Sequence, residues 1–167
     1  AADGADSRVR ALAGIEPRVR PYHQTGVVAN FDLSVPHGGV ARQWFREDGV
    51  LALLPLPGDR VSIVWSTPDA HAAELLALAP DALCERVREA AQDRCGALRL
   101  ITPARGFPLR LQTVPRLVLP RLALVGDAAH NLHPLAGQGV NLGFQDAREL
   151  AQVLAGRGPQ DDCGDYR

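Results

Sequence analysis

The 167-residue sequence contains no methionine and no lysine, so all 18 of its basic residues are arginine. Its net charge of −1 gives no electrostatic attraction to nucleic acid, and we expect no nucleic-acid partner. It also contains no apolar run near the roughly 18 residues that a membrane-spanning helix needs. Since position 1 is not methionine and alanine and leucine are abundant, we expect an internal piece of a longer protein.

Cysteine is scarce. Cys84, Cys95 and Cys163 are odd in number and show no Cys-x-x-Cys spacing. This excludes a disulfide framework and a zinc ribbon, and it suits a reducing compartment. We therefore expect a cytoplasmic protein.

The most informative stretch runs from Arg121 to Asp146. Residues 122–125 predict a short buried strand, a Gly-Asp turn follows it, and a helix is expected to begin near Gly137 after a loop closed by Pro134. A carboxylate just past a strand can accept hydrogen bonds from ribose hydroxyls, while free amides at 137–139 suit anionic or carbonyl oxygens. The stretch therefore predicts a site for a phosphate- and ribose-bearing cofactor.

Two other interpretations of this stretch are open. Asp127, His130 and His133 have side chains of the types that bind metals. A proline directly after His133 and a glycine-rich helix start have no role in such a site, so we predict no metal. The stretch could also be an ordinary strand-loop-helix unit whose glycines only allow close packing.

The order Gly126-Asp127, His133-Pro134 and Gly137-Gln138-Gly139-Val140-Asn141 resembles the second flavin motif of the FAD-dependent aromatic hydroxylases of the para-hydroxybenzoate hydroxylase type. The amino-acid sequence of this stretch is most similar to that of the ubiquinone-biosynthesis hydroxylases. The resemblance implies that Asp127 holds the ribityl or ribose hydroxyls of FAD and that Pro134 lies against the isoalloxazine. We expect His133 and Pro134 to be the catalytic residues. The cofactor-binding residues of this stretch would be Gly126, Asp127, Pro134, Gly137, Gln138, Gly139, Val140 and Asn141.

The N-terminal residues carry a second signal. An Asp3-Gly4 turn is followed by Asp6 and Ser7, either of which can cap a helix. This pattern resembles the middle motif of the same hydroxylases. By that resemblance Asp3 and Arg8 would help place the FAD pyrophosphate and a reduced nicotinamide cofactor, NAD(P)H. The inner side of the helix is expected to carry Val9, Leu12 and Ala13.

The middle of the chain is strand-rich. Residues 24–33 alternate between apolar and polar, and short strands at 40–46, 50–56 and 61–66 follow between turns. These four strands predict an antiparallel meander.

Proline marks the start of two further helices, near 67–69 and 79–81, the first with Pro68 at its first helical position. Strands are expected at 98–101 and 107–113. The last helix begins near Gly139 and ends by Gly156. Its apolar stripe would comprise Val140, Phe144, Ala147, Ala151 and Leu154.

We therefore predict a mixed α+β and α/β protein. An antiparallel substrate-binding sheet domain with helices, residues 21–116, joins part of a Rossmann-like FAD-binding domain, residues 1–20 and 117–167. The Gly-x-Gly-x-x-Gly spacing with which the family seats the ADP half of FAD does not occur. The chain alone is expected to be inactive and to hold FAD weakly or not at all.

The strand at 50–56 bears on the substrate. In the family, members that act on benzoates place cationic groups on the equivalent strand, whereas this strand is entirely apolar. An apolar wall suits a polyprenylated phenol, although a strand buried on both faces would look the same. The predicted substrate residues are Gln43, Trp44, Leu53 and Pro55.

The resemblance implies an FAD-dependent aromatic-ring monooxygenase of ubiquinone biosynthesis, in which NAD(P)H and O2 serve oxygen transfer to a small, prenylated aromatic substrate. The alternatives are a hydroxylase of a soluble aromatic or polyketide, and a non-catalytic module on the same scaffold. Residues 116–121 suggest a peripheral contact with the inner membrane or with a ubiquinone-biosynthesis complex, and a solvated loop is the alternative. His130 is expected to hydrogen-bond within its loop. Surface positions are expected for His23, His37 and His71.

Overall fold

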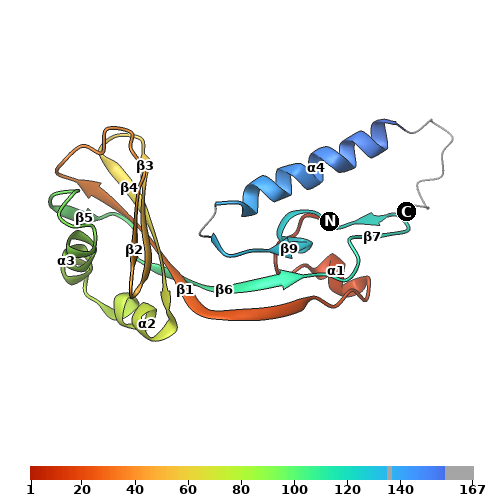
Figure 1. Cartoon of the computed structure of the whole chain (residues 1–167), viewed down its shortest axis with the longest axis horizontal. Coiled ribbons are helices and arrows are strands. Elements are labelled where there is room, and N and C mark those ends of the chain that lie inside the picture. Colours follow the sequence, from red (N-terminus) through yellow and green to blue (C-terminus); the bar gives the residue numbers. More distant parts are fainter. Residues whose placement is uncertain (135–136, 157–167) are drawn as a thin grey trace. The chain divides into compact units, whose positions relative to one another are not determined.

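The computed structural model describes residues 1–134 and 137–156, and the chain forms two compact units (Figure 1). Unit 1 comprises residues 1–22 and 110–167, and unit 2 comprises residues 23–109. The sequence had suggested divisions after 20 and after 116. The observed divisions fall inside two continuous strands, β1 (Arg18–Leu33) and β6 (Arg105–Thr113), so no break in the hydrophobic pattern marks them.

The sheet of unit 2 has the strand order β2-β3-β4-β1. The strands are β2 (Arg42–Arg46), β3 (Gly49–Leu56), β4 (Arg60–Pro68) and β1. All pairs are antiparallel, and β1 pairs with β4, from Gln24 opposite Pro68 to Asp32 opposite Arg60. The predicted simple meander is therefore wrong at its first connection, because β1 does not pair with β2.

The segment between β1 and β2 carries the chain to the far edge of the sheet, and His37 fixes it there. The Nδ1 atom of His37 accepts a hydrogen bond from the Gly39 N–H at 2.9 Å. Its Nε2–H therefore donates, and it lies 3.1 Å from the Leu56 carbonyl oxygen and 2.8 Å from that of Gly58. A residue that we expected to be merely on the surface thus ties the crossover to the β3–β4 turn.

Helices α2 (Asp69–Ala77) and α3 (Pro80–Ala90) contribute to the core of unit 2 together with one face of the sheet. Pro80 begins α3 as predicted, whereas Pro68 ends β4 and is the N-cap residue of α2. Because strand side chains alternate, every second residue points at the helices. The largest fully buried side chains of this core are Trp65, Phe31, Leu51, Ile63, Leu75, Leu83, Val27, Val61 and Val87.

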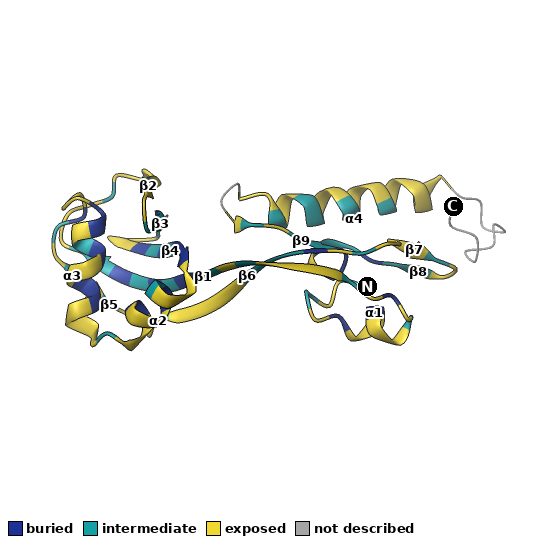
Figure 2. Ribbon diagram, turned by 60° about the horizontal axis from the view of Figure 1, so that its bottom comes forward, coloured by how far each residue is buried: buried dark blue, intermediate teal, exposed yellow. Residues whose placement is uncertain are grey.

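The opposite face of this sheet carries the intervening residues, and we call it the open face. Leu54 is 41% exposed there, whereas its neighbour Leu53 is 5% exposed in the core. Strands β5 (Leu98–Leu100) and β6 border β1. Figure 2 shows buried residues gathered in α3 and the strands of unit 2, while α4 is exposed or half-buried along its length.

Unit 1 contains several short elements and one long helix. In chain order these are α1 (Arg8–Leu12), β7 (Val118–Leu119), β8 (Leu122–Ala123), the 3-10 turn η1 (Gly126–Ala128), β9 (His130–Asn131) and α4 (Gly139–Ala155). Strand β7 pairs with β8, and β9 pairs with the end of β6.

The buried apolar cluster of unit 1 comprises Ile15, Leu124 and Ala129. The inner side predicted for α1 is wrong for Val9 and Leu12, which are 41% and 87% exposed, whereas Ala13 packs against the apolar cluster as predicted. Arg10 is the buried residue of the helix. No residue of α4 is buried, although the helix has the predicted bounds and ends at Gly156. An apolar stripe gives the period of a helix but does not show what covers it.

Candidate functional site

The Gly126-Asp127 turn forms the centre of the candidate site. It is a 3-10 turn, and Gly126 adopts a left-handed φ of 60° that favours glycine. Helix α4 passes close by at Gly143, where an added Cβ would lie 3.4 Å from the Gly126 Cα. The two glycines therefore let the helix approach the turn closely.

A hollow of about 760 Å³ lies beside this turn, within unit 1. Its lining is mostly apolar, with a single carboxylate from Asp127. It comprises Ala2, Gly4, Val125, Gly126, Asp127, Asn131, Leu132, Pro134, Gly137, Gly139, Val140, Gly143, Phe144 and Ala147. Six of the predicted cofactor residues thus meet in one place: Gly126, Asp127, Pro134, Gly137, Gly139 and Val140.

The polar groups at this hollow are of two kinds. Asp127 is exposed, and its carboxylate has no hydrogen-bond partner among residues 1–134 and 137–156. The N–H groups of Gly139, Val140 and Asn141 stand in the first turn of α4, where a helix offers them no acceptor. The site therefore offers a hydrogen-bond acceptor at the turn and donors at the helix start.

One predicted donor is already engaged. The N–H of Gly137 donates to the Pro134 carbonyl oxygen at 2.9 Å, so it is not free for a ligand as we expected. The Asn141 side chain donates to the Gly137 carbonyl at 3.3 Å, and Gln138 is exposed but does not line the hollow. These residues shape the loop and the start of the helix.

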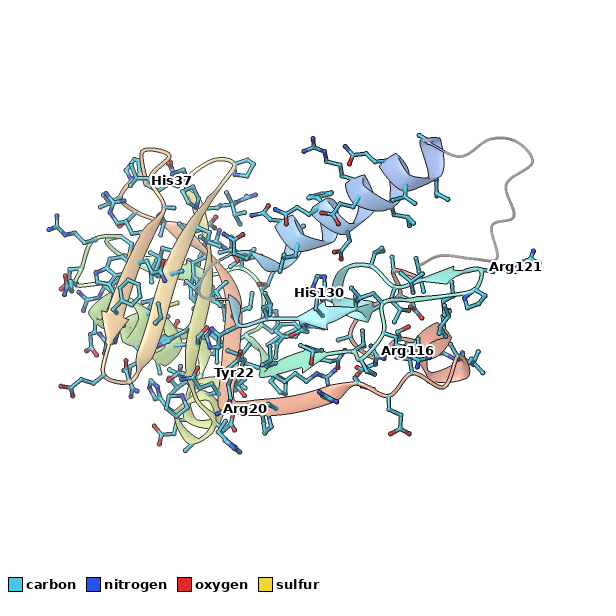
Figure 3. The ribbon with its side chains drawn as sticks, turned by 45° about the vertical axis from the view of Figure 1, so that its right-hand side comes forward. Arg20, Tyr22, His37, Arg116, Arg121 and His130 are labelled. Carbon is cyan, nitrogen blue, oxygen red and sulfur yellow. The ribbon has the colours of Figure 1, made fainter. Side chains whose placement is uncertain are left out.

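Asp146 ties α4 to the turn, a role that the sequence pattern did not indicate. Its Oδ2 accepts hydrogen bonds from the Gly126 N–H at 2.7 Å and from the ring Nε2 of His130 at 2.8 Å. His130 thus reaches helix α4 rather than bonding within its own loop (Figure 3). The spacing could have indicated this role, since Gly143 and Asp146 are three residues apart and lie on one helix face.

His133 does not line the hollow, although its neighbours Leu132 and Pro134 do. Its ring packs edge-on against Tyr22, with centroids 4.9 Å apart and planes at 81°. Burial lowers the pKa of the His133 imidazole, which favours its neutral form. No group of three His, Cys, Asp or Glu side chains in the described part of the chain could hold a metal ion.

The N-terminal motif forms the start of helix α1. Ser7 is the N-cap of α1, as its position suggested, and its Oγ accepts from the Arg10 N–H at 3.0 Å. Asp3 accepts from the Ser7 hydroxyl at 2.5 Å and from the Val9 N–H at 3.2 Å, and these bonds lower the pKa of its carboxyl. Arg8 is exposed. Asp3 therefore shapes the helix start, while Arg8 stays available to solvent.

Two buried polar side chains, Arg10 and Gln112, hold the backbone around the site. Arg10 donates to the carbonyls of Ala128 at 2.9 Å and Ala5 at 2.8 Å. Gln112 donates to the carbonyl of Ala5 at 3.0 Å and to that of Asp127 at 3.4 Å. Both connect the N-terminal segment to the Gly-Asp turn. The sequence pattern did not identify them, because such ties depend on three-dimensional proximity.

The predicted substrate residues do not share one face of the sheet. Gln43 pairs with Ala52 and lies on the open face, whereas Trp44 pairs with Leu51 and packs against the core. Leu53 is in the core, and Pro55 has the same parity along β3. The structure therefore places Trp44, Leu53 and Pro55 on the core side of the sheet. The sequence could not show this for Leu53 and Pro55, because a wholly apolar strand carries no alternation that distinguishes its two faces.

The segment considered as a membrane contact is the β7–β8 hairpin. Leu119 and Leu122 pack against the small core of unit 1, while Leu117 and Val118 are 47% and 40% exposed. Of the helices described, none has the length and apolar character required to span a bilayer.

Curated relatives support the motif assignment. The chain is 41% identical over 153 residues to "Ubiquinone hydroxylase UbiL" of Rhodospirillum rubrum, which covers 92% of this chain and 36% of that protein. It is 38% identical over 188 residues to "Ubiquinone biosynthesis monooxygenase COQ6, mitochondrial" of Homo sapiens, covering 92% of this chain and 40% of that protein. The chain thus spans about two fifths of the length of these relatives.

Solved structures confirm the predicted mixed fold. PqsL of Pseudomonas aeruginosa, a probable FAD-dependent monooxygenase, matches with a TM-score of 0.78 and 31% identity, over 92% of this chain and 44% of that chain. An aklavinone-11 hydroxylase in complex with FAD and aklavinone matches in fold, with a TM-score of 0.72 and 23% identity, over 93% of this chain and 31% of that chain. The FAD binding domain family matches residues 1–161, and the chain therefore belongs to that family.

Proposed function

We propose that this chain is part of a flavoprotein monooxygenase that hydroxylates the aromatic ring of a polyprenylated phenol in ubiquinone biosynthesis, with NAD(P)H and O2 as co-substrates. The observation that carries the proposal is the hollow of unit 1, where the Asp127 carboxylate and the start of α4 meet beside Gly126 and Pro134. This carboxylate has no hydrogen-bond partner in the part of the chain that the structure describes. The ubiquinone-biosynthesis relatives supply the choice of substrate.

The hollow fits a flavin in four respects. A carboxylate suits the hydroxyls of a ribityl or ribose unit, and the free amides of a helix start suit an oxygen that carries negative charge. The glycines at 126, 137, 139 and 143 leave the backbone open to a flat ring. The volume of about 760 Å³ lies within the usual range for ligand pockets.

In this role Asp127 would accept hydrogen bonds from the sugar hydroxyls, and the N–H groups of Gly139 and Val140 would stabilise negative charge on the bound ring. Pro134, Val140 and Phe144 would cover the ring with apolar surface and exclude water. When bound, FAD supplies the redox chemistry with O2, and the protein supplies position, dryness and charge.

The proposed reaction also requires a nicotinamide cofactor, and its substrate is found at a membrane. NAD(P)H is the reductant that a flavin monooxygenase consumes, and Arg8 is an exposed cation in the N-terminal motif that could meet its phosphates. A polyprenyl chain partitions into lipid, so the protein would collect its substrate at the inner-membrane surface, alone or within a ubiquinone-biosynthesis complex.

Replacement of Asp127 tests the proposal. In the full-length enzyme, Asp127→Ala removes a charge-assisted hydrogen bond of about 1.5–3 kcal/mol, so the affinity for FAD should fall roughly tenfold to a hundredfold. FAD affinity is measured by quenching of flavin fluorescence at increasing protein concentration. Glu149→Ala is the matched control, an exposed carboxylate of α4 outside the hollow, and it should bind as the parent does. Equal affinities of parent and Asp127→Ala would remove Asp127 from the site.

A further inference from the structure

A second hollow, of about 320 Å³, lies in unit 2. It is lined by Val28 and Asn30 of β1 and by residues of β6 and of the segment that leads into it. The latter are Thr102, Pro103, Arg105 and Phe107. The hollow of unit 1 shares no residue with it.

The glycines of β1 and β6 show that this hollow is on the open face. A Cβ added to Gly106 would lie 2.8 Å from the Leu76 side chain of helix α2, so that position faces the helices. Arg105 and Phe107, one residue to either side, therefore face the other way. A Cβ on Gly26 would lie 3.5 Å from the Leu109 side chain, which puts the even-numbered residues of β1 on the same open face.

The hollow combines an aromatic ring, a cation and an amide. Phe107 is 54% exposed, and Arg105 is exposed without an ion-pair partner among the described residues. The backbone of Asn30 is fixed, since its N–H donates to the Thr102 hydroxyl at 3.1 Å and its carbonyl accepts from the Ile101 N–H at 2.8 Å. The Asn30 carboxamide is half-buried and has no partner within the described ranges, so it can serve a ligand.

An apolar track leads away from this hollow across the sheet. Val28 pairs with Val64 on β4, and Val64 pairs with Ala52 on β3. Leu54, 41% exposed, lies two residues along β3 on the same face. The open face thus offers a polar hollow at one edge and a continuous apolar surface beside it.

We propose that the hollow binds an aromatic ring that carries an acidic oxygen, a carboxylate or a phenolate, with the apolar track taking an aliphatic substituent of that ring. Phe107 packs against the ring, Arg105 pairs with the acidic oxygen and Asn30 hydrogen-bonds a ring substituent. The volume is at the lower end for ligand pockets and suits one substituted ring. This inference rests on the proposed function and specifies its substrate. Strand β3 has no cationic side chain to pair with an acidic oxygen, and Arg105 of β6 provides one.

Amide NMR titrations of the 167-residue chain with 4-hydroxybenzoate and with phenol test the inference. Both probes should shift the amide signals of Val28, Asn30 and Phe107. If the carboxylate is the recognised group, Arg105→Gln should weaken the binding of 4-hydroxybenzoate about twofold to fivefold and leave the binding of phenol unchanged. The expected change is small because an exposed ion pair contributes modestly to affinity. Phe107→Ala should weaken both probes about fivefold to tenfold through loss of ring packing.

Two matched control variants test whether the effects are specific to residues of the hollow. Phe45→Ala removes another exposed ring of this sheet, and Arg86→Gln removes an exposed cation of helix α3. Both should bind the probes as the parent does. If Arg105→Gln also weakens the binding of phenol, and does so only at a pH at which phenol is ionised, phenolate is the recognised oxygen. Absence of shifts at the hollow, or equal affinities of the parent and both hollow variants, would overturn the inference. Normal FAD binding by the same variants would leave the proposed function standing.

Discussion

The two units of this protein are held together differently. Unit 2 has a continuous apolar core in which Trp65, Phe31, Leu51 and Ile63 are fully buried between sheet and helices. Unit 1 has a far smaller buried cluster, and α4 buries none of its residues within the described structure. The candidate flavin site lies in the unit with the smaller core.

Unit 1 compensates with polar ties. Arg10 and Gln112 hold the N-terminal segment to the Gly-Asp turn, and Asp146 holds α4 to the same turn. Each of these bonds fixes a backbone group next to the hollow. Hydrogen bonds are directional, whereas apolar burial is not, so this arrangement positions the site at modest overall stability. The comparison predicts that unit 2 is sensitive to core substitutions and unit 1 to loss of single polar groups.

The largest effect is expected in the core of unit 2. Leu53→Asp buries a carboxylate without a partner and should lower the free energy of unfolding by more than about 4 kcal/mol, which is enough to unfold the unit. Leu54→Asp, one residue away on the open face, should change it by only about 0.5 kcal/mol. Urea denaturation monitored by the fluorescence of the two tryptophans, Trp44 and Trp65, measures both. Similar losses for the two variants would contradict the assignment of faces.

In unit 1, the largest effect is expected from Arg10→Ala. It removes two hydrogen bonds from a buried cation to backbone carbonyls and should lower the free energy of unfolding of the unit by about 2–4 kcal/mol. Hydrogen exchange of the amides around the Gly-Asp turn measures this loss of stability. Arg8→Ala is the control, since Arg8 is exposed in the same helix. If both variants exchange at the parent's rate, Arg10 does not hold the turn.

Asp146→Ala should have a smaller effect. It removes the acceptor for the Gly126 N–H and for His130, with an expected loss of about 1–3 kcal/mol and faster exchange of the Gly126 amide. Asp146→Asn retains an oxygen acceptor and should retain at least half of this stability. Should the asparagine variant be as unstable as the alanine variant, the negative charge rather than the hydrogen bond would be the essential feature.

The smallest effect concerns pH. The hydrogen bond from the Ser7 hydroxyl, followed by that from the Val9 N–H, lowers the pKa of the Asp3 carboxyl below its ordinary 3.8. Because the folded pKa is depressed, the stabilisation of α1 is present above pH 3.8 and is lost as the pH falls through the folded pKa. Carboxyl NMR of Asp3 should show this low pKa, and Ser7→Ala should raise it toward 3.8. A titration unchanged by Ser7→Ala would show that the hydroxyl does not cause the shift.

The sequence predicted the strands and helices of unit 2 well, but not the order of the strands within the sheet. Alternation in 24–33 and the turns around 47–49 and 57–59 mark strands because local chemistry determines them. The pairing of β1 with β4 depends on a crossover that no local pattern encodes, and His37 shows its importance only once the carbonyls of Leu56 and Gly58 are nearby.

The site was predictable as a motif and less so as a structure. Gly126, Asp127 and the start of α4 could be placed because a turn, a carboxylate and a helix start follow one another in sequence. Arg10, Gln112 and Asp146 were not predicted because each forms hydrogen bonds with residues that are distant in sequence. His133 was predicted as a catalytic residue, but it packs against Tyr22 and does not line the hollow, because the direction of a loop side chain depends on tertiary packing.

The central claim is that the hollow of unit 1 is a flavin site, and amide NMR of the 167-residue chain during titration with FAD tests it most directly. Because the sequence lacks a Gly-x-Gly-x-x-Gly unit, we expect weak binding in fast exchange rather than a stoichiometric yellow complex. The account predicts shifts at Gly126, Asp127, Gly139 and Val140 that Asp127→Ala largely abolishes. Shifts confined to unit 2, or none at these four amides, would contradict it.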